Sequence, residues 1–320
     1  MPCTLVVGGP THVPIDSTFK LKLTQCCFRS FRSSLSLALS SPMTSFLLAA
    51  ASCAATLSPV EIANGVMMPA MNLGHPDDSS SVSSGVQLWT EVGGRGIDTA
   101  YDYRNQDQVA AGVKAEIANG VGREELFITT KISPSTCSRE AALQAVQEDV
   151  KELAGIKPDL VLHHFPCSSG RHHASGSNAA VWQGLQDALA QGLTRAIGVS
   201  NYAAGDIDEV LAVGGVPPAV NQCQMSVGSH DDATIKYCQR HNITYEAYSP
   251  LRRVDLTDSR ITKIANNHNA TTAQVALRWI NQQGVVIATS PGMNREYALA
   301  DLAIGDFRLG DDEMSSLSAI

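Results

Sequence analysis

The stretch "RGIDTAYDYRNQ", residues 95–106, combines features that a strand and a loop do not usually share. Asp98 closes a short apolar run, and two tyrosines follow within five residues. A hydrophobic core excludes an unpaired carboxylate, and a solvent-facing loop has no need of phenols. We therefore interpret Asp98 and Tyr103 as part of a site that other residues complete in space.

Short apolar segments of this kind recur along the chain from about residue 57. The segment "VEIANGVMMPA", residues 60–70, predicts a β-hairpin that turns at Asn64 and Gly65, a strong two-residue turn signal. Eight strands are predicted to follow it, at residues 70–74, 96–100, 126–132, 159–165, 195–200, 219–224, 244–249 and 285–290.

Helical patterns lie between these strands. After the potential N-cap Ser138, apolar residues repeat at helical spacing at Leu143, Val146, Val150 and Leu153. A second pattern, Val181, Leu185 and Leu189, stops at Gly192. A third, with Val275 and Trp279, begins after Thr271 or Thr272. Eight strands alternating with helices predict a parallel (β/α)8 TIM barrel with an N-terminal β-hairpin. A doubly wound Rossmann sheet is the main alternative, but no G-x-G-x-x-G follows an early strand.

Polar residues gather where the predicted strands end. They are Asp98, Lys131, His163, His164, Ser200, Asn201, Gln222, Tyr248, Ser249, Thr289 and Ser290. Because barrel enzymes carry their chemistry on the loops after the strands, these residues predict a site on one rim.

The residue types in this set indicate a proton donor. A phenol such as Tyr103 is a weak acid at neutral pH, and the ammonium of Lys131 would lower its pKa. Asp98 would hold that ammonium charged and aimed, and a neutral histidine would orient a carbonyl group. Side chains do not supply hydride, so this chemistry requires a nicotinamide cofactor.

The motifs "GRGIDTAYDYRNQ", "LFITTKI", "DLVLHHFP", "AIGVSNY", "AVNQ", "EAYSPL" and "IGDFRLGDDEM" occur in the order found in aldo-keto reductases. Residues 60 to 318 resemble this family of NADPH-dependent barrels that reduce aldehydes and ketones. The resemblance implies a catalytic tetrad of Asp98, Tyr103, Lys131 and His164. We assign the histidine to His164 because an aromatic residue and a proline follow it, and we expect His163 to contact core or helix.

The same resemblance implies how the cofactor is held. Ser200, Asn201 and Gln222 are expected to hydrogen-bond its carboxamide, and Tyr248 to stack on its nicotinamide. Ser249 and Leu251 lie where the pyrophosphate passes, and Ser290 and Arg295 lie by the 2′-phosphate. Thr289 stands where the family usually has a phosphate-binding lysine. NADPH is therefore the expected cofactor, with NADH as the alternative.

Other departures from the family concern the substrate, a small aldehyde or ketone. Gln224 replaces a family glutamate, and Ile320 closely follows the last predicted helix. Without the longer C-terminal loop of many relatives, we expect an open, unselective pocket, with residues 167–178 on its rim. The alternative function is a non-catalytic, NADPH-sensing regulatory subunit; the intact tetrad favours an enzyme. A monomer is expected from the family.

Residues 1–56 differ from the rest in composition. They are poor in acid and end in an apolar run of about a dozen residues, too short for a membrane span. We interpret them as a signal or transit segment, or as a disordered extension, before a barrel of residues 57–320. The location is then cytoplasmic or organellar. The net charge of −8, with no basic run in the barrel, argues against nucleic acid as a partner.

The cysteines of the barrel are Cys137, Cys167, Cys223 and Cys238. They are widely spaced and form no C-x-x-C pair, so we expect neither a zinc site nor a disulfide framework, and a reducing compartment. His172 and His173 lie in a Gly/Ser-rich loop and are interpreted as solvated rather than metal-binding. Sequons at Asn242 and Asn269 leave a secreted glycoprotein as a further alternative.

Overall fold

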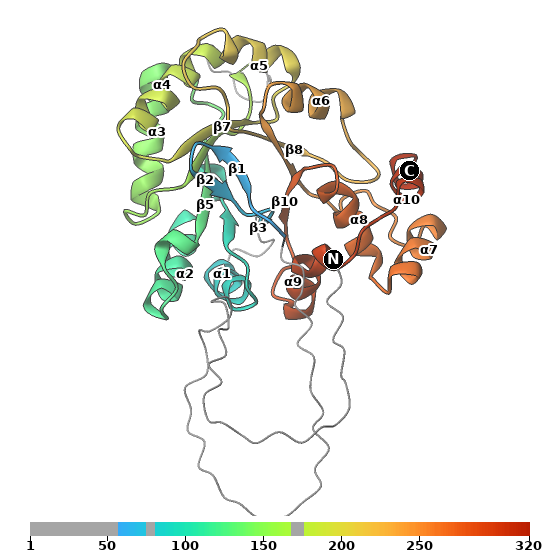
Figure 1. Cartoon of the computed structure of the whole chain (residues 1–320). Coiled ribbons are helices and arrows are strands. Elements are labelled where there is room, and N and C mark those ends of the chain that lie inside the picture. Colours follow the sequence, from blue (N-terminus) through green and yellow to red (C-terminus); the bar gives the residue numbers. More distant parts are fainter. Residues whose placement is uncertain (1–56, 75–80, 168–175) are drawn as a thin grey trace, which may run out of the picture. The chain divides into compact units, whose positions relative to one another are not determined.

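The computed structural model describes residues 57–74, 81–167 and 176–320 (Figure 1). The predicted leader, residues 1–56, lies outside the described residues, and so do His172, His173 and most of the predicted rim loop. Within the described ranges, no helix combines the length and the apolar character needed to cross a membrane.

Eight parallel strands close into a barrel in the order β10-β3-β4-β5-β6-β7-β8-β9. Each lies within one of the eight predicted segments: β3 (Met71–Leu73), β4 (Gly96–Asp98), β5 (Phe127–Ile132), β6 (Leu160–His163), β7 (Ala196–Ser200), β8 (Val220–Gln224), β9 (Thr244–Tyr248) and β10 (Val286–Thr289). The prediction of a (β/α)8 barrel is confirmed, and the Rossmann alternative is wrong.

Helices surround the barrel: α1 (Val82–Glu91), α2 (Gln106–Ala118), α3 (Arg139–Glu152), α4 (Asn178–Ala190), α5 (Ala204–Leu211), α6 (Asp232–Arg240), α7 (Ser259–His268), α8 (Thr272–Asn281), α9 (Arg295–Leu302) and α10 (Asp311–Ser318). Two predicted N-caps are confirmed, since Ser138 Oγ accepts from Ala141 N at 3.2 Å and Thr271 Oγ1 accepts from Gln274 N at 3.1 Å. Ser200 caps no helix, because α5 begins after Ala203.

The predicted hairpin is also confirmed. Strands β1 (Val60–Ala63) and β2 (Val66–Met68) pair in an antiparallel sheet, and Gly65 in the turn has a φ of 69°. The apolar side chains of the hairpin pack in one buried cluster with residues at the starts of barrel strands; this cluster includes Ile62, Val66, Met68, Phe127, Leu160, Ala196, Val220 and Val286. The hairpin therefore covers the N-terminal end of the barrel.

Asp159 binds together the starts of neighbouring strands at that same end. Its carboxylate accepts from Ile128 N at 2.8 Å, from Arg123 Nη2 at 2.8 Å and from Arg195 Nη1 at 3.0 Å. The backbone of Asp159 also bonds to both neighbours, accepting from Ala196 N and donating to Ile128 O. Asp159 is buried, so these charge-assisted bonds offset the cost of removing its charge from water.

Candidate active site

The loop after β4 is held by its own hydrogen bonds, and this places Tyr103. Residues Tyr101–Tyr103 form one turn of 3₁₀ helix, which ends at Arg104 in the left-handed conformation (φ 56°). The Thr99 hydroxyl donates to Asn105 Oδ1 at 2.6 Å and closes the base of the loop. Tyr103 is thereby directed back toward the strand end that carries Asp98, with which it lines one pocket.

Lys131, near the end of β5, joins the two residues of the opening stretch. Its Nζ donates to the Asp98 carboxylate, to Thr99 O at 3.0 Å and to Tyr103 Oη at 3.3 Å. Burial by itself lowers the pKa of Lys131, but Asp98, Tyr103 and Glu246 raise it above its ordinary value. The ammonium therefore remains charged although its side chain is fully buried.

The pKa of Tyr103 moves in the direction opposite to our expectation. Burial raises it most, and the charge of Asp98 adds to this increase; Lys131 lowers it but does not outweigh them. The prediction of a lowered pKa was wrong because the partial burial of Tyr103 could not be inferred from the sequence. In the protein alone Tyr103 is a firmly protonated phenol.

The two histidines at the end of β6 face different surroundings. The His164 ring lies edge-on to the Tyr103 ring, with centroids 5.6 Å apart, and stacks on Phe165. His163 is buried, and its Nδ1 lies 2.7 Å from Tyr202 Oη. Burial lowers the pKa of His163 to about 3, so its imidazole is neutral. The structure thus places His164 next to Tyr103 and His163 in the core, as expected from the residues that follow them.

Glu246, inside β9, is an acid that the sequence reasoning missed. Its carboxyl accepts from Gln222 Nε2 at 2.8 Å and from Asn72 Nδ2 at 3.1 Å. Gln222 Nε2 also donates to Asp98 Oδ2 at 2.7 Å, so the acid is linked to the site by one amide. Burial, followed by the charge of Asp98, raises the pKa of Glu246 well above its ordinary value. The signal was an acid within the apolar strand "TYEAY".

A groove of about 540 Å³ opens at the C-terminal ends of the strands. It contains seven of the predicted site residues, and its lining is Gly74, Asp98, Tyr103, Gln222, Tyr248, Ser249, Pro250, Leu251, Arg252, Ala288, Thr289 and Ser290. Arg252 was not predicted; it follows the motif "AYSPL" and brings a guanidinium to a groove that lacks the expected lysine.

Ser200 and Asn201, at the end of β7, are connected to the groove through hydrogen bonds. Ser200 Oγ donates to Gln222 O at 2.8 Å. Asn201 Nδ2 donates to His164 O at 3.0 Å, and Asn201 Oδ1 accepts from Tyr248 Oη at 2.8 Å. Asn201 therefore holds Tyr248 on one side and the backbone of His164 on the other.

Thr289, at the position of the expected lysine, and Arg295, expected near a 2′-phosphate, both have other partners. Thr289 is buried, and its hydroxyl donates to Asp301 Oδ2 of α9 at 2.7 Å. Arg295, at the start of α9, is half-exposed and lies 3.1 Å from Glu91 of α1. Arg295 is not part of the groove lining. A phosphate bound beside Arg295 would compete with Glu91 for its guanidinium.

The expectation of no disulfide was wrong. A disulfide joins Cys137, after β5, to Cys167, after β6. These cysteines are 30 residues apart, but β5 and β6 are neighbouring parallel strands. Their following loops therefore lie side by side, which cysteine spacing alone does not reveal.

Comparison with known proteins identifies the family of this barrel. A model of the Aldo/keto reductase family matches residues 61–320. The chain belongs to this family. It is 34% identical over 265 residues to glyoxal reductase of Bacillus subtilis, covering 82% of this chain and 92% of that protein. It is 33% identical over 278 residues to morphine 6-dehydrogenase of Pseudomonas putida, covering 82% and 90%.

Among solved structures, the aldo-keto reductase AKR2E4 of Bombyx mori in complex with NADP is similar, with a TM-score of 0.77 and 28% identity. The match covers 82% of this chain and 92% of that one. Membership of the aldo-keto reductases, with relatives named as reductases and dehydrogenases, identifies an oxidoreductase and supports carbonyl reduction as the general class of reaction.

Proposed function

We propose that the protein reduces aldehydes or ketones to alcohols with NADPH, and that Tyr103 donates the proton. The observation that carries this proposal is the position of Lys131 Nζ, which donates both to Asp98 and to Tyr103 Oη at the edge of the groove. A buried ammonium beside a phenol stabilises the phenolate that forms when the phenol gives up its proton, and such charge partners are typical of functional sites.

In this proposal each member of the tetrad has one task. Tyr103 gives its proton to the carbonyl oxygen as that oxygen becomes an alkoxide, and Lys131 stabilises the phenolate that remains. Asp98 keeps the ammonium charged and fixed in position. His164, whose ring lies against that of Tyr103, orients the carbonyl oxygen toward the phenol.

The groove suits a nicotinamide dinucleotide, which supplies the hydride when bound. Gln222 uses its Nε2 on Asp98 and Glu246, which leaves Oε1 to accept from a carboxamide. Tyr248, held by Asn201, offers its ring for stacking, and Ser200 supports Gln222.

Ser249, Leu251 and Ser290 line the part of the groove that we assign to the phosphates. Arg252 offers them a guanidinium, and Arg295 offers a second once it leaves Glu91. The NADP complex of the Bombyx mori relative favours NADPH. Because Thr289 replaces a lysine, we retain NADH as a second cofactor.

The test follows the oxidation of NADPH and of NADH by the full chain with a reactive aromatic aldehyde. We expect turnover by the parent and a loss of at least ~100-fold in kcat for Tyr103→Phe. Tyr101→Phe is the matched control, because Tyr101 lies in the same turn but outside the groove lining. If neither cofactor is oxidised but one still binds, a nucleotide-sensing subunit becomes the better interpretation.

The remaining sequence predictions accompany this proposal. We propose that residues 1–56 form a targeting segment or a disordered extension ahead of the barrel of residues 57–320. We also propose that the protein acts as a monomer on small carbonyl compounds. The apolar run of the leader and its low acid content support the first point.

A further inference from the structure

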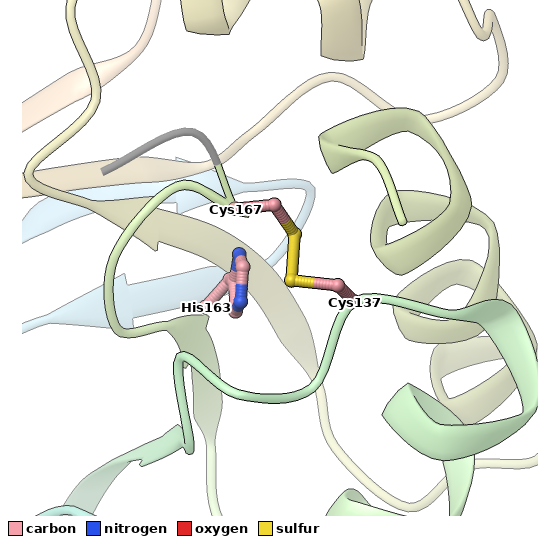
Figure 2. A group of neighbouring side chains, drawn as sticks. All are labelled: Cys137, His163 and Cys167. Carbon is pink, nitrogen blue, oxygen red and sulfur yellow. A yellow bond between two sulfur atoms is a disulfide. The ribbon is translucent and has the colours of Figure 1, made fainter. Parts of the chain in front are cut away.

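A second cluster of reactive side chains lies outside the groove. Cys137, His163 and Cys167 each offer one ligand atom, and these atoms all lie within 4.8 Å of one another. The three residues come from the loop after β5, the end of β6 and the loop after β6. Figure 2 shows the His163 ring beside the two sulfur atoms. The mechanism of carbonyl reduction proposed above uses none of these three side chains.

His163 Nε2 is buried and has no hydrogen-bond partner among the residues that the structure describes. Whether this nitrogen carries a proton can be inferred from the hydrogen bonds around the other ring nitrogen, Nδ1. Tyr202 Oη donates its hydrogen to Asn178 Oδ1 at 3.2 Å, so at 2.7 Å it accepts from His163 Nδ1–H. We therefore assign the proton of the neutral imidazole to Nδ1, which leaves the lone pair on Nε2. One nitrogen of this ring lies within 4.8 Å of both sulfur atoms.

The same network also fixes one of the cysteines. Asn178 Oδ1 accepts from Cys167 N at 2.9 Å, so Asn178 connects the backbone of Cys167 to the hydroxyl that orients His163. An imidazole held through its second nitrogen is the usual arrangement around a metal-binding histidine. A buried lone pair with no donor is otherwise a cost to folding.

We propose that Cys137, Cys167 and His163 form a binding site for a thiophilic divalent cation such as Zn²⁺ when their disulfide is reduced. A dithiol or phosphine reductant breaks the S–S bond and is itself oxidised, and the two sulfur atoms gain two electrons and two protons. The cation then displaces both protons. Two thiolates balance its charge, so the site, which is buried except at Cys167, is neutral.

The dimensions and the ligand types suit this cation. Thiolates bound tetrahedrally at about 2.3 Å from zinc lie about 3.8 Å apart, so the sulfur atoms must separate on reduction. The two Cα atoms are 5.9 Å apart, and rotation of the side chains supplies that separation. Two cysteines and one histidine leave a fourth position for water, a known zinc coordination. Disulfide and metal therefore exclude each other.

The test uses the full chain with the four leader cysteines replaced by serine, so that only cysteines of the barrel remain. The protein is reduced with a phosphine, freed of reductant without oxygen, and titrated with Co²⁺ as a spectroscopic probe for the zinc site. We expect one Co²⁺ per reduced chain, with a thiolate-to-cobalt charge-transfer band, and no such band in the oxidised chain. The leader substitutions are Cys3→Ser, Cys26→Ser, Cys27→Ser and Cys53→Ser.

Variants separate this site from adventitious binding. Cys137→Ser and His163→Gln should each weaken Co²⁺ binding by at least about 100-fold, more than loss of an outer partner. Tyr202→Phe, which removes only the orienting hydroxyl, should weaken it by about 10-fold to 100-fold. Cys223→Ser is the matched control, because this free cysteine lies outside the cluster, and it should bind like the parent.

A second measurement keeps all the barrel cysteines, so its result does not depend on whether a variant folds. Zn²⁺ should protect Cys137 and Cys167, but not Cys223, from alkylation in the reduced chain, as peptide mass spectrometry would show. The proposal is overturned if the reduced chain binds no stoichiometric Co²⁺, if Zn²⁺ protects neither cysteine, or if reduction unfolds the chain and Zn²⁺ does not restore it.

Discussion

Glu246 and Asp98 accept hydrogen bonds from the same amide nitrogen, Gln222 Nε2, at 2.8 and 2.7 Å. Two acids so close together do not both ionise easily. Asp98 has the ammonium of Lys131 beside it, whereas Glu246 has two neutral amides. Glu246 therefore retains its proton to a higher pH than an exposed glutamate.

Glu246→Gln should change the pH dependence of reduction. When Glu246 ionises, its charge raises the pKa of Tyr103 and keeps the phenol protonated to higher pH. Glutamine removes this charge, so the alkaline decline of kcat/KM should move to lower pH. Rates at pH 6 to 10 would measure it. Glu116→Gln, a buried acid of α2, is the control; equal profiles for all three proteins would contradict the prediction.

Lys131→Met should lower both activity and stability. It leaves the buried Asp98 without its cation, and removing one partner of a buried ion pair costs about 3–5 kcal/mol in the free energy of unfolding. Urea denaturation measures that loss. The double variant Asp98→Asn with Lys131→Met removes both charges and should regain part of the stability but none of the activity. A double variant no more stable than Lys131→Met would exclude this electrostatic origin.

Glu91→Gln should favour NADPH over NADH. Glu91 holds the Arg295 guanidinium at the surface, and exposed pairs of this kind are worth at most about 1 kcal/mol. Freed from Glu91, Arg295 should lower the KM for NADPH by up to about fivefold and leave that for NADH unchanged. Arg295→Gln should raise the KM for NADPH alone. If both cofactors respond equally to either change, Arg295 does not contact the 2′-phosphate.

Asp149→Asn should make stability less dependent on pH. Burial raises the pKa of Asp149 to about 8, although Gln106 donates to its Oδ1 at 3.0 Å. The folded chain thus holds a proton that the unfolded chain loses near pH 4. Stability from this proton is complete below pH 4 and is lost as the pH rises toward 8, by at most about 1.4 kcal/mol per pH unit.

Urea unfolding at pH 5 and pH 8 measures this slope in Asp149→Asn and in the parent. The variant should lose less stability across that interval than the parent loses. Asp187→Asn, at a partly exposed position on α4, is the control for a general change in charge. Parallel slopes for Asp149→Asn and the parent would show that Asp149 is ionised in the folded protein.

Most of the fold could be predicted because its signals are local. Alternating apolar segments, the Asn64–Gly65 turn and the caps at Ser138 and Thr271 each depend on a few adjacent residues. The disulfide between Cys137 and Cys167 could not be predicted, since it requires knowing which loops are neighbours. Cysteine spacing is informative only when both cysteines belong to the same local segment.

The position of the candidate site could be predicted from the sequence, but the hydrogen bonds between its residues could not. Strand ends located the groove residues, and the structure brings seven of the predicted ones together in it. The bond of Thr289 to Asp301 could not be predicted, because it depends on how α9 packs. The raised pKa of Tyr103 depends on burial of the ring. Such properties arise from packing, which a linear pattern does not contain.

The bonds of Asp159 stabilise one end of the barrel independently of the groove at the other end. Its bonds to Arg123, Arg195 and Ile128 N fasten three neighbouring strands at the end of the barrel away from the groove. These bonds lie at the opposite end of the barrel from the groove that we propose as the active site. Substitutions in the loops around the groove do not break these hydrogen bonds. The range of carbonyl compounds accepted can therefore change during evolution while the barrel keeps its fold.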